Sequence, residues 1–389
     1  MSGFVQSHLK DMNRMQVYRL LSLVRETSKA DISRRTGISE TTVIKIINFF
    51  LDTGLVSESG DGKSVMGRKP QLLRFNPDTA YAVGVYLEGH FLNIGLVNLI
   101  GEVIHHKKVV IEDLNIEHMV KRDIAVNIED AIVSSGVDRT KILAVGVGIP
   151  PAVLDNKDKK IWLAPVIELD EPISLKEDFD YLEKRFQIPF YIENDVNVAA
   201  VGEFLSWKHI INDMAYISLG TGLGMGIILN GKIRRGARGC AGEISRMVFD
   251  PDYIPEKKAY GWLEQKVNLK AVLLEYGMSI HDFKKGIISH FREVIDYITP
   301  VLALSIVNFA VPLDLDLVVL GGVFADILGQ DLIDALNNKI KSLCPMGTDV
   351  YLQKSSDPGV VGAAMMAIDE NLHKLLGEEG ATWQAEQLG

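Results

Sequence analysis

Asn194 and Asp195 are the side chains in this chain best placed for small-molecule chemistry. Apolar residues alternate through Ile188, Phe190 and Ile192, which indicates a strand with the pair at its end. A helical pattern follows at once. In open α/β sheets, ligands bind just beyond the carboxyl ends of the strands, so we expect the pair to face a ligand. The alternative is that Asp195 only caps the following helix.

The elements around this pair follow a repeated plan of strand, loop, strand, hairpin and strand. The first copy is predicted at residues 81–86, 91–97 and 102–110, and the second at 214–219, 226–229 and 232–233. A glycine-rich loop, 220–226, lies within the second copy, and Asn230-Gly231 is a strong hairpin signal. Two such copies predict a duplicated α/β domain with a cleft between its halves.

Further helices and buried strands connect and follow the two copies. Helices are predicted at residues 116–134, 175–186, 280–309, 331–343 and 359–376, and strands at 142–149, 315–320 and 350–352.

The composition is that of a globular protein of two or three domains, with 389 residues of which 47% are hydrophobic. Cys240 and Cys344 cannot form a disulfide framework and lack metal-ligand spacing, which favours a reducing compartment. No signal peptide is recognisable, and polar residues and a proline interrupt the apolar stretch 301–323. We therefore expect a cytoplasmic protein without a membrane span.

Charge is unevenly divided between the two ends of the chain. Residues 1–76 hold 12 basic and 7 acidic side chains, a net charge of +5, whereas the remainder carries −15. A basic head on an acidic body indicates that only the head meets a polyanion.

The head has the pattern of a winged helix-turn-helix. Helices are predicted at 13–25, at 29–36 and at 40–51, with Gly37 ending the second and Ser39 capping the third. The third helix is predicted to turn apolar residues inward, namely Val43, Ile44, Ile47 and Phe50. Strands at 55–58 and 71–75 would form the wing.

The outward face of the third helix carries groups that can hydrogen-bond base edges or phosphates. The candidate DNA-binding residues are Ser39, Thr41, Thr42, Lys45 and Asn48, with Arg68 and Lys69 at the tip of the wing. The expected partner is double-stranded operator DNA, bound by a homodimer or a dimer of dimers. The alternative is a helical protein-interaction head with a solvated basic loop.

Several motifs, taken in order and spacing, resemble the ROK family of sugar-responsive repressors and sugar kinases. They are Gly146-Val147-Gly148-Ile149-Pro150, Ile192-Glu193-Asn194-Asp195, Gly220-Thr221-Gly222-Leu223-Gly224, Ala241-Gly242-Glu243-Ile244 and Leu320-Gly321-Gly322. The resemblance implies an α/β fold, in which an N-terminal winged helix-turn-helix precedes a duplicated actin-like ATPase (ribonuclease H-like) core. We expect a head at 1–76, a small domain at 77–193 plus 360–389, and a large domain at 194–359.

The resemblance also implies a sugar site. Its members would be Asn194, Asp195, Glu243, Arg246 and Glu264. In a kinase of this family Asp195 would be the general base on the attacking hydroxyl. The alternatives are that Glu243 is only a charge at a helix end and Glu264 part of a solvated helix face. Arg246 either pairs with one of these glutamates or binds a more acidic ligand.

Two departures from the family pattern concern its cofactors. The zinc-binding histidine and three cysteines are replaced by Arg246, Pro255, Lys257 and Trp262, so we expect no metal, with the loop held by packing of Tyr260 and Trp262 and with Cys240 buried. The kinase motif Asp-x-Gly-Gly-Thr reads Tyr86-Leu87-Glu88-Gly89-His90, which removes a phosphate-binding element. We expect neither ATP nor another cofactor.

These observations predict a sugar-responsive repressor of carbohydrate-utilisation genes that is not an enzyme. Two alternatives stay open. One is a sugar kinase that carries a DNA-binding head, for which Asp195 would be catalytic. The other is a regulator controlled by a protein partner, as some repressors of the family are.

Overall fold

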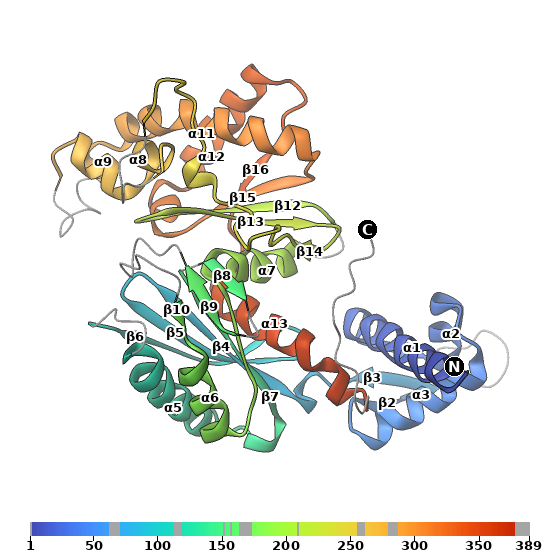
Figure 1. Ribbon diagram of the computed structural model, residues 1–389. Helices are drawn as coiled ribbons and strands as arrows, with labels where there is room; N and C mark the ends of the chain where they lie inside the picture. The colour runs from blue at the N-terminus through green and yellow to red at the C-terminus, as the bar shows by residue number, and fades with distance from the viewer. Residues whose placement is uncertain are drawn as a thin grey trace.

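Two five-stranded sheets with the same strand plan form the body of the protein (Figure 1). The computed structural model describes residues 2–61, 71–112, 118–150, 152–155, 158–162, 173–207, 210–254, 261–278 and 287–377. The first sheet, in the order β11-β7-β4-β5-β6, contains β4 (Tyr81–Glu88), β5 (Phe91–Asn98), β6 (Val103–Val110), β7 (Ile142–Ile149) and β11 (Phe190–Asn194). The second, in the order β14-β13-β12-β15-β16, contains β12 (Met214–Leu219), β13 (Leu223–Leu229), β14 (Lys232–Ile233), β15 (Leu317–Gly321) and β16 (Val350–Leu352).

The pairing confirms the predicted duplication. In each sheet the central strand pairs antiparallel with the strand that follows it, β4 with β5 and β12 with β13. On its other side it pairs parallel with a later strand, β7 or β15. Asn230 and Gly231 have φ of 53° and 71°, as the tight hairpin between β13 and β14 requires. β13 begins at Leu223, so four of the seven residues of the predicted glycine-rich loop belong to a strand.

Two helices, α7 (Asp195–Trp207) and α13 (Pro358–Leu375), lie between the two sheets (Figure 1). They approach each other closely enough that only glycine fits at the contact. A Cβ atom on Gly202 would lie 1.9 Å from the carbonyl oxygen of Pro358, and one on Gly362 would lie 1.7 Å from that of Val198. α13 packs on β4 and β7, whereas α7 packs on β12 and β13. The helix pair therefore joins the two sheets.

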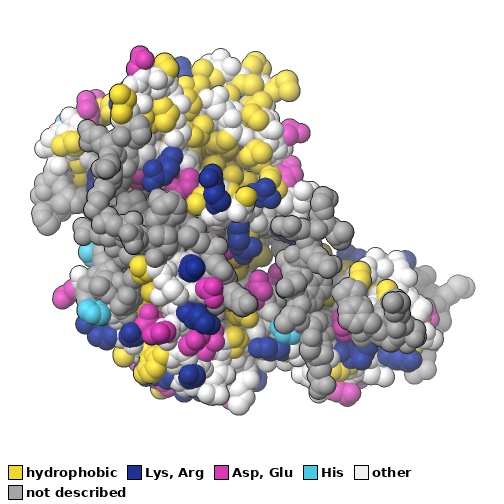
Figure 2. Space-filling model, in the orientation of Figure 1, with side chains coloured by type: hydrophobic (Ala, Val, Ile, Leu, Met, Phe, Trp, Pro, Cys, Tyr) yellow, Lys and Arg dark blue, Asp and Glu magenta, His cyan; other side chains and the backbone are white. Residues whose placement is uncertain are grey.

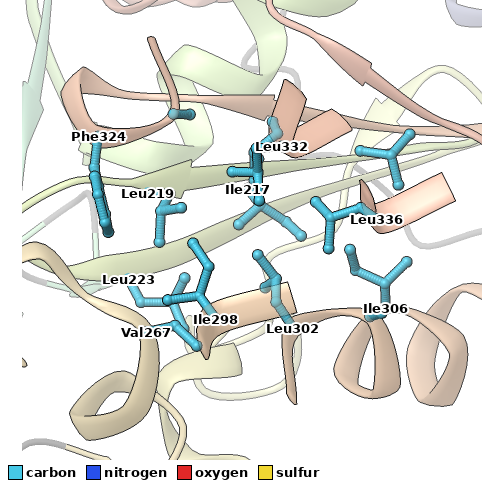
Figure 3. Packing of buried hydrophobic residues seen from close by; sticks show 14 of the residues in the cluster. Ile217, Leu219, Leu223, Val267, Ile298, Leu302, Ile306, Phe324, Leu332 and Leu336 are labelled. Atoms are coloured by element: carbon cyan, nitrogen blue, oxygen red, sulfur yellow. The ribbon is translucent and has the colours of Figure 1, made fainter. Parts of the chain in front are cut away.

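The largest hydrophobic cluster fills the space between the second sheet and its outer helices (Figure 3). These helices are α8 (Glu264–Val267), α9 (Leu269–Glu275), α11 (Phe291–Leu313) and α12 (Val323–Leu343). Ile217 and Leu219 from β12 face Ile298 and Leu302 from α11, and all four are fully buried. Alternation on the strands and a wide apolar stripe on the helices produce this core.

Of these helices, α12 differs from the sequence-based expectation, and α11 has an unusually apolar composition. α12 begins eight residues before the predicted start, and its axis is broken at Gly329, whose φ of 56° and ψ of −144° are not helical. α11 is long and apolar enough to cross a membrane, the one such helix among the described residues, but half of its most apolar window is buried inside the protein. Its inner face belongs to the core.

The outer face of the first sheet is covered by a second hydrophobic cluster. A π-helical turn (Met119–Ile124) leads into α5 (Ala125–Ser135), and α6 (Lys176–Phe186) packs beside β11. Both helices end near their predicted residues. A small antiparallel sheet adds β8 (Ala152–Asp155), β9 (Lys160–Trp162) and β10 (Ile173–Ser174).

The head combines three helices with a three-stranded sheet. Its elements are α1 (Ser2–Val24), β1 (Glu26–Ser28), α2 (Lys29–Thr36), α3 (Glu40–Asp52), β2 (Val56–Asp61) and β3 (Gln71–Phe75). Gly37 ends α2 with φ of 72°, and the Ser39 side chain accepts a hydrogen bond from the Thr42 amide, so both predicted caps are confirmed. β2 and β3 pair as predicted, whereas β1, which pairs with β3, was not foreseen.

One predicted core residue of the head lies outside its core. Ile44 was expected to face inward, but 43% of it is exposed. The buried residues of α3 are Val43, Ile46, Ile47 and Phe50. Four consecutive apolar or β-branched residues allow two helical stripes, and packing against the rest of the head selects the one that contains Ile46.

Head and body share one hydrophobic cluster. Val17 and Leu21 of α1 belong to the same cluster as Leu372 and Leu376 at the end of α13. The Arg14 guanidinium donates a hydrogen bond of 2.5 Å to the Leu376 carbonyl oxygen. α13 thus runs from the region between the two sheets to the base of the head (Figure 1).

Candidate functional site

Asn194 and Asp195 stand where β11 ends and α7 begins, as the sequence predicts. The Asn194 Oδ1 atom accepts hydrogen bonds from the amides of Val196 (3.0 Å) and Asn197 (3.1 Å). These bonds satisfy the first turn of α7, so Asn194 provides the cap that was considered for Asp195. Asp195 Oδ1 accepts from the Val196 amide at 2.8 Å and from Asn194 Nδ2 at 3.1 Å.

The surroundings of Asp195 favour its neutral form. Burial, together with the negative charges of Glu243 and Glu88, raises the pKa of Asp195 from 3.8 to about 7, and the hydrogen bond from the Val196 amide acts in the opposite direction. A carboxyl that titrates near neutrality can accept a hydrogen bond or a proton from a hydroxyl group.

Glu264 is held inside the protein at the start of α8. It is 7% exposed, and its Oε1 atom accepts a hydrogen bond of 3.2 Å from the Leu223 amide. Burial raises the pKa of Glu264, the amides of Leu223 and Gly261 lower it, and the charge of Glu243 raises it. Glu264 is therefore buried and does not lie on a solvated helix face, which was the alternative.

Glu243 precedes a single 3₁₀ turn, Ile244–Arg246, and Arg246 is the last residue of that turn. Their side chains are 38% and 49% exposed, and Arg246 Nε lies 4.0 Å from Glu243 Oε2. Burial raises the pKa of Glu243 and the charge of Arg246 lowers it. Because the charge of Glu243 acts on both Asp195 and Glu264, the structure brings these carboxyl groups within electrostatic reach of one another.

Tyr86 and Glu88, which replace residues of the kinase motif, lie beside this group. A Cβ atom on Gly359 would lie 2.3 Å from the Tyr86 ring, so the ring packs directly on the start of α13. Burial raises the pKa of Tyr86, and the charges of Asp195 and Glu88 add to that rise. Burial also raises the pKa of Glu88, although Lys108 opposes it.

Trp262, one of the four residues at the expected zinc positions, makes an aromatic contact instead. The Trp262 ring meets Phe249 edge to face at a centroid distance of 5.5 Å, and Lys266 Nζ lies 5.7 Å from the Trp262 centroid. Pro255, Lys257 and Tyr260 lie outside the described residues. In the part of the chain that is described, no group of three or more histidine, cysteine or acidic side chains is arranged to hold a metal. Cys240 is free and half-buried, not fully buried as expected.

The candidate DNA-contacting residues of α3 lie on one side of the helix. Thr41, Lys45 and Asn48 are exposed and Thr42 is half-buried. The Ser39 hydroxyl lies 3.1 Å from that of Thr41 and 2.9 Å from that of Thr42, in addition to its capping bond. Arg68 and Lys69 lie outside the described residues.

Two buried glutamates beside the site were not singled out from the sequence. Glu193 accepts hydrogen bonds from the Asn194 amide and from Asn197 Nδ2, and forms an ion pair of 2.6 Å with Arg235. Glu203, fully buried on α7, accepts from the Trp207 indole. An acidic residue inside an otherwise apolar strand or helix is the signal that could have revealed both.

Most of this chain matches the model of one known protein family. A model of the ROK family matches residues 82–370. This chain belongs to the ROK family.

The ROK chain also resembles individual proteins. It is 30% identical over 244 residues to a putative xylose repressor of Caldicellulosiruptor sp. (strain Rt8B.4), covering 62% of this chain and 60% of that protein. It is 29% identical over 297 residues to the xylose repressor of Caldicellulosiruptor bescii (75% and 72% covered). Identity to the Escherichia coli K12 transcriptional dual regulator NagC is 27% over 247 residues (62% and 59%). The match therefore spans about 60% of the length of two of these relatives.

Two crystal structures share the fold of this ROK protein. A ROK family transcriptional regulator, a homologue of the E. coli MLC protein, superposes with a TM-score of 0.77 at 21% identity, covering 95% of this chain and 99% of that one. A ROK family glucokinase from Streptomyces griseus, in complex with glucose and AMPPNP, gives 0.60 at 25% identity, covering 75% and 100%. The two-domain core is thus of the sugar-kinase type, and the regulator matches nearly the whole chain.

Proposed function

We propose that this protein is a sugar-responsive transcriptional repressor of carbohydrate-utilisation genes and not an enzyme. Relatives named xylose repressor and N-acetylglucosamine repressor support this function. The observation that carries it is the Tyr86 ring, which packs on Gly359 beside a retained group of sugar-site carboxyls. The sugar side of a kinase site is kept, whereas its phosphate side is filled by a phenol and by the carboxyl group of Glu88.

The effector is a sugar held by carboxyl and amide groups. Asp195, Glu243 and Glu264 accept its hydroxyl hydrogens, because each carboxylate offers two oxygen acceptors of charge-assisted strength, and Asn194 contributes its amide group. Arg246 supplies a donor at the exposed edge. The bond from the Leu223 amide fixes Glu264 before the sugar arrives, which lowers the entropy cost of binding.

The DNA-binding part is a winged helix-turn-helix made of α2, α3 and the hairpin β2–β3. α3 enters the major groove, where Lys45 and Asn48 reach bases or phosphates. Arg68 and Lys69 on the wing contact the minor groove. Because the head is basic and the body is acidic, the DNA is attracted to the head and repelled by the body.

The sugar acts on the head through α13. This helix has 18 residues and is about 27 Å long at 1.5 Å per residue. Its first turn touches Tyr86 and its end shares a core with α1 and α3. A sugar that binds the closed and open arrangements of the sheets with different affinity therefore shifts the population of head positions.

The working form is a cytoplasmic homodimer or dimer of dimers. The lobe that contains β12–β16 carries many exposed apolar side chains, which Figure 2 shows as broad yellow areas. The exposed large apolar residues of this lobe, by their accessible surface, include Val248, Ile254, Leu274, Ile288, Leu343 and Met346. Apolar surface of this kind marks protein–protein contacts, and paired heads match palindromic operators.

A sugar kinase is the second candidate, favoured by Asp195. A carboxyl with a pKa of about 7 suits a general base on an attacking hydroxyl. Yet the carboxyl group of Glu88 would oppose a nucleotide phosphate, and the described residues hold no group of three or more histidine, cysteine or acidic side chains arranged for a metal. An assay coupled to ADP release, run over a sugar panel, separates the two: turnover with any sugar supports the kinase.

The repressor is tested by selecting duplexes from a random pool with the full chain, after a thermal-shift screen of pentoses, hexoses and amino sugars. We expect an enriched, palindromic sequence whose affinity changes with one of the sugars. Asp195→Asn keeps the shape of the side chain, so it should bind the DNA normally but lose most of the sugar response. Binding no tighter than to random DNA at physiological salt would contradict the proposal.

A further inference from the structure

The outward face of α3 contains one large apolar side chain. Thr41, Lys45 and Asn48 are exposed and lie four and three residues apart, which places them on one stripe of the helix. Ile44 lies within this stripe, three residues after Thr41 and four before Asn48, and 43% of it is exposed. The opposite stripe, from Val43 to Phe50, is buried in the head.

Hydroxyl groups at the start of α3 are already engaged. Ser39 Oγ caps the helix and lies within hydrogen-bond distance of the hydroxyls of Thr41 and Thr42. These short side chains therefore already make hydrogen bonds at the start of the helix. Ile44, Lys45 and Asn48 project from the next turn, where a recognition helix meets the base edges.

The major groove offers one apolar group to such a side chain. Among the four bases, only thymine carries a methyl group there, at C5, and proteins read it by apolar contact. Exposing the isoleucine side chain to water is unfavourable. Contact with the thymine methyl group removes apolar surface of both groups from water. Lys45 beside it can neutralise a neighbouring phosphate and hold the helix in register.

We propose that Ile44 is a specificity-determining residue that reads a thymine methyl group in each half of the operator. This inference rests on the proposed DNA-binding function and deepens it by assigning one base to one side chain. Burying one methyl group contributes about a fourfold change in affinity. A two-fold symmetric site with one such contact in each half would give about fifteenfold, if the halves act independently.

The test removes the methyl group from the DNA and the side chain from the protein. The full chain first selects a duplex from a random pool, and each thymine of that duplex is then replaced by deoxyuridine in turn. Affinities are measured for the wild type and for Ile44→Ala by fluorescence anisotropy. We expect one symmetric pair of positions where deoxyuridine weakens the wild type about fifteenfold and Ile44→Ala less than twofold.

Controls separate this contact from other effects. Val133→Ala, at a 69% exposed site on α5 in the body, should give the wild-type response at every position. Ile44→Ala should keep the thermal midpoint, because the side chain is exposed. If deoxyuridine weakens both proteins equally at every position, Ile44 reads no methyl group. If no duplex is enriched at all, DNA binding itself is wrong and the inference falls with it.

Discussion

The protonation state of Asp195 near neutral pH depends on the surroundings of its side chain. Burial and the charges of Glu243 and Glu88 raise its pKa to about 7, while Asn194 takes over the capping of α7. Asp195 adds one further bond, from the Val196 amide, to the two that Asn194 already provides. A carboxyl whose pKa is raised this far by its surroundings is typical of functional residues.

This pKa shift predicts that the free energy of unfolding depends on pH. The folded state holds the Asp195 proton more tightly than the unfolded chain, so stability is lost as the pH rises from about 4 towards 7. Asp195→Asn removes that loss and keeps an Oδ1 acceptor. We expect the variant to be more stable than the wild type at pH 8, on the order of 2 kcal/mol, with a smaller gap at pH 5. Urea unfolding at both values measures it, and an equal gap at the two would contradict it.

Among the elements, α7 and the segment before α13 are joined by the side chain of Glu203 and by a contact between Lys354 and Trp207. Glu203 is fully buried and accepts hydrogen bonds from Trp207 Nε1 (2.8 Å) and from the amides of Lys354 and Ser355 (both 2.9 Å). The Lys354 ammonium lies 3.1 Å from the centroid of the Trp207 ring. The carboxylate thus fixes where the chain enters α13.

Glu203→Ala should destabilise the protein by about 3 kcal/mol or more, because it leaves buried donors without an acceptor. Glu203→Gln keeps one acceptor oxygen and should cost less. Urea unfolding monitored by tryptophan fluorescence gives both values. Glu112→Ala, at an exposed position, is the control and should change the midpoint little.

The sequence predicts most elements because their patterns are local. The ends of α2, the start of α3 and the bounds of β7, β12 and β16 agree with the structure, since caps and alternation are read within a few residues. Asn194 and Asp195 were found in the same way, from a strand that stops. Ile44 was misplaced because two apolar stripes overlap in α3, and only packing chooses between them.

Contacts between distant segments could not be predicted. Tyr86 packs on Gly359, and Arg14 bonds to a carbonyl 362 positions away. Nothing near either residue in the sequence indicates its partner, because long-range packing is set by the whole fold. The same holds for the role of Glu203. The positions of Asn194 and Asp195 at the end of a strand were thus predictable, whereas contacts between segments distant in the sequence were not.

At the scale of the whole molecule, Arg14 joins three elements. From α1 it bonds to the end of α13, and its guanidinium carbon lies 4.0 Å from the centroid of the Phe49 ring on α3. A planar guanidinium can make both contacts at once, whereas an ammonium group cannot. Arg14 therefore connects the end of α13 directly to α3.

Arg14→Lys should keep the affinity for DNA and for sugar within about threefold but reduce the factor by which sugar changes DNA affinity. The reason is that coupling depends on the two elements moving together, while each site stays intact. Anisotropy titrations with and without sugar measure this factor. A variant with wild-type coupling, or one with both affinities lost, would contradict a positioning role. Arg19→Lys, on the same helix, is the control.

The common core of head and body limits how such a chain can be recombined. Leu372 and Leu376 lie among residues of α1 and α3, so a body cut free at residue 76 would expose them to water. A head grafted from a relative would meet a surface shaped for other side chains. To exchange operator preference between such proteins, the last turns of α13 must therefore be transferred together with the head. The alternative is to substitute only the residues on the outer side of α3.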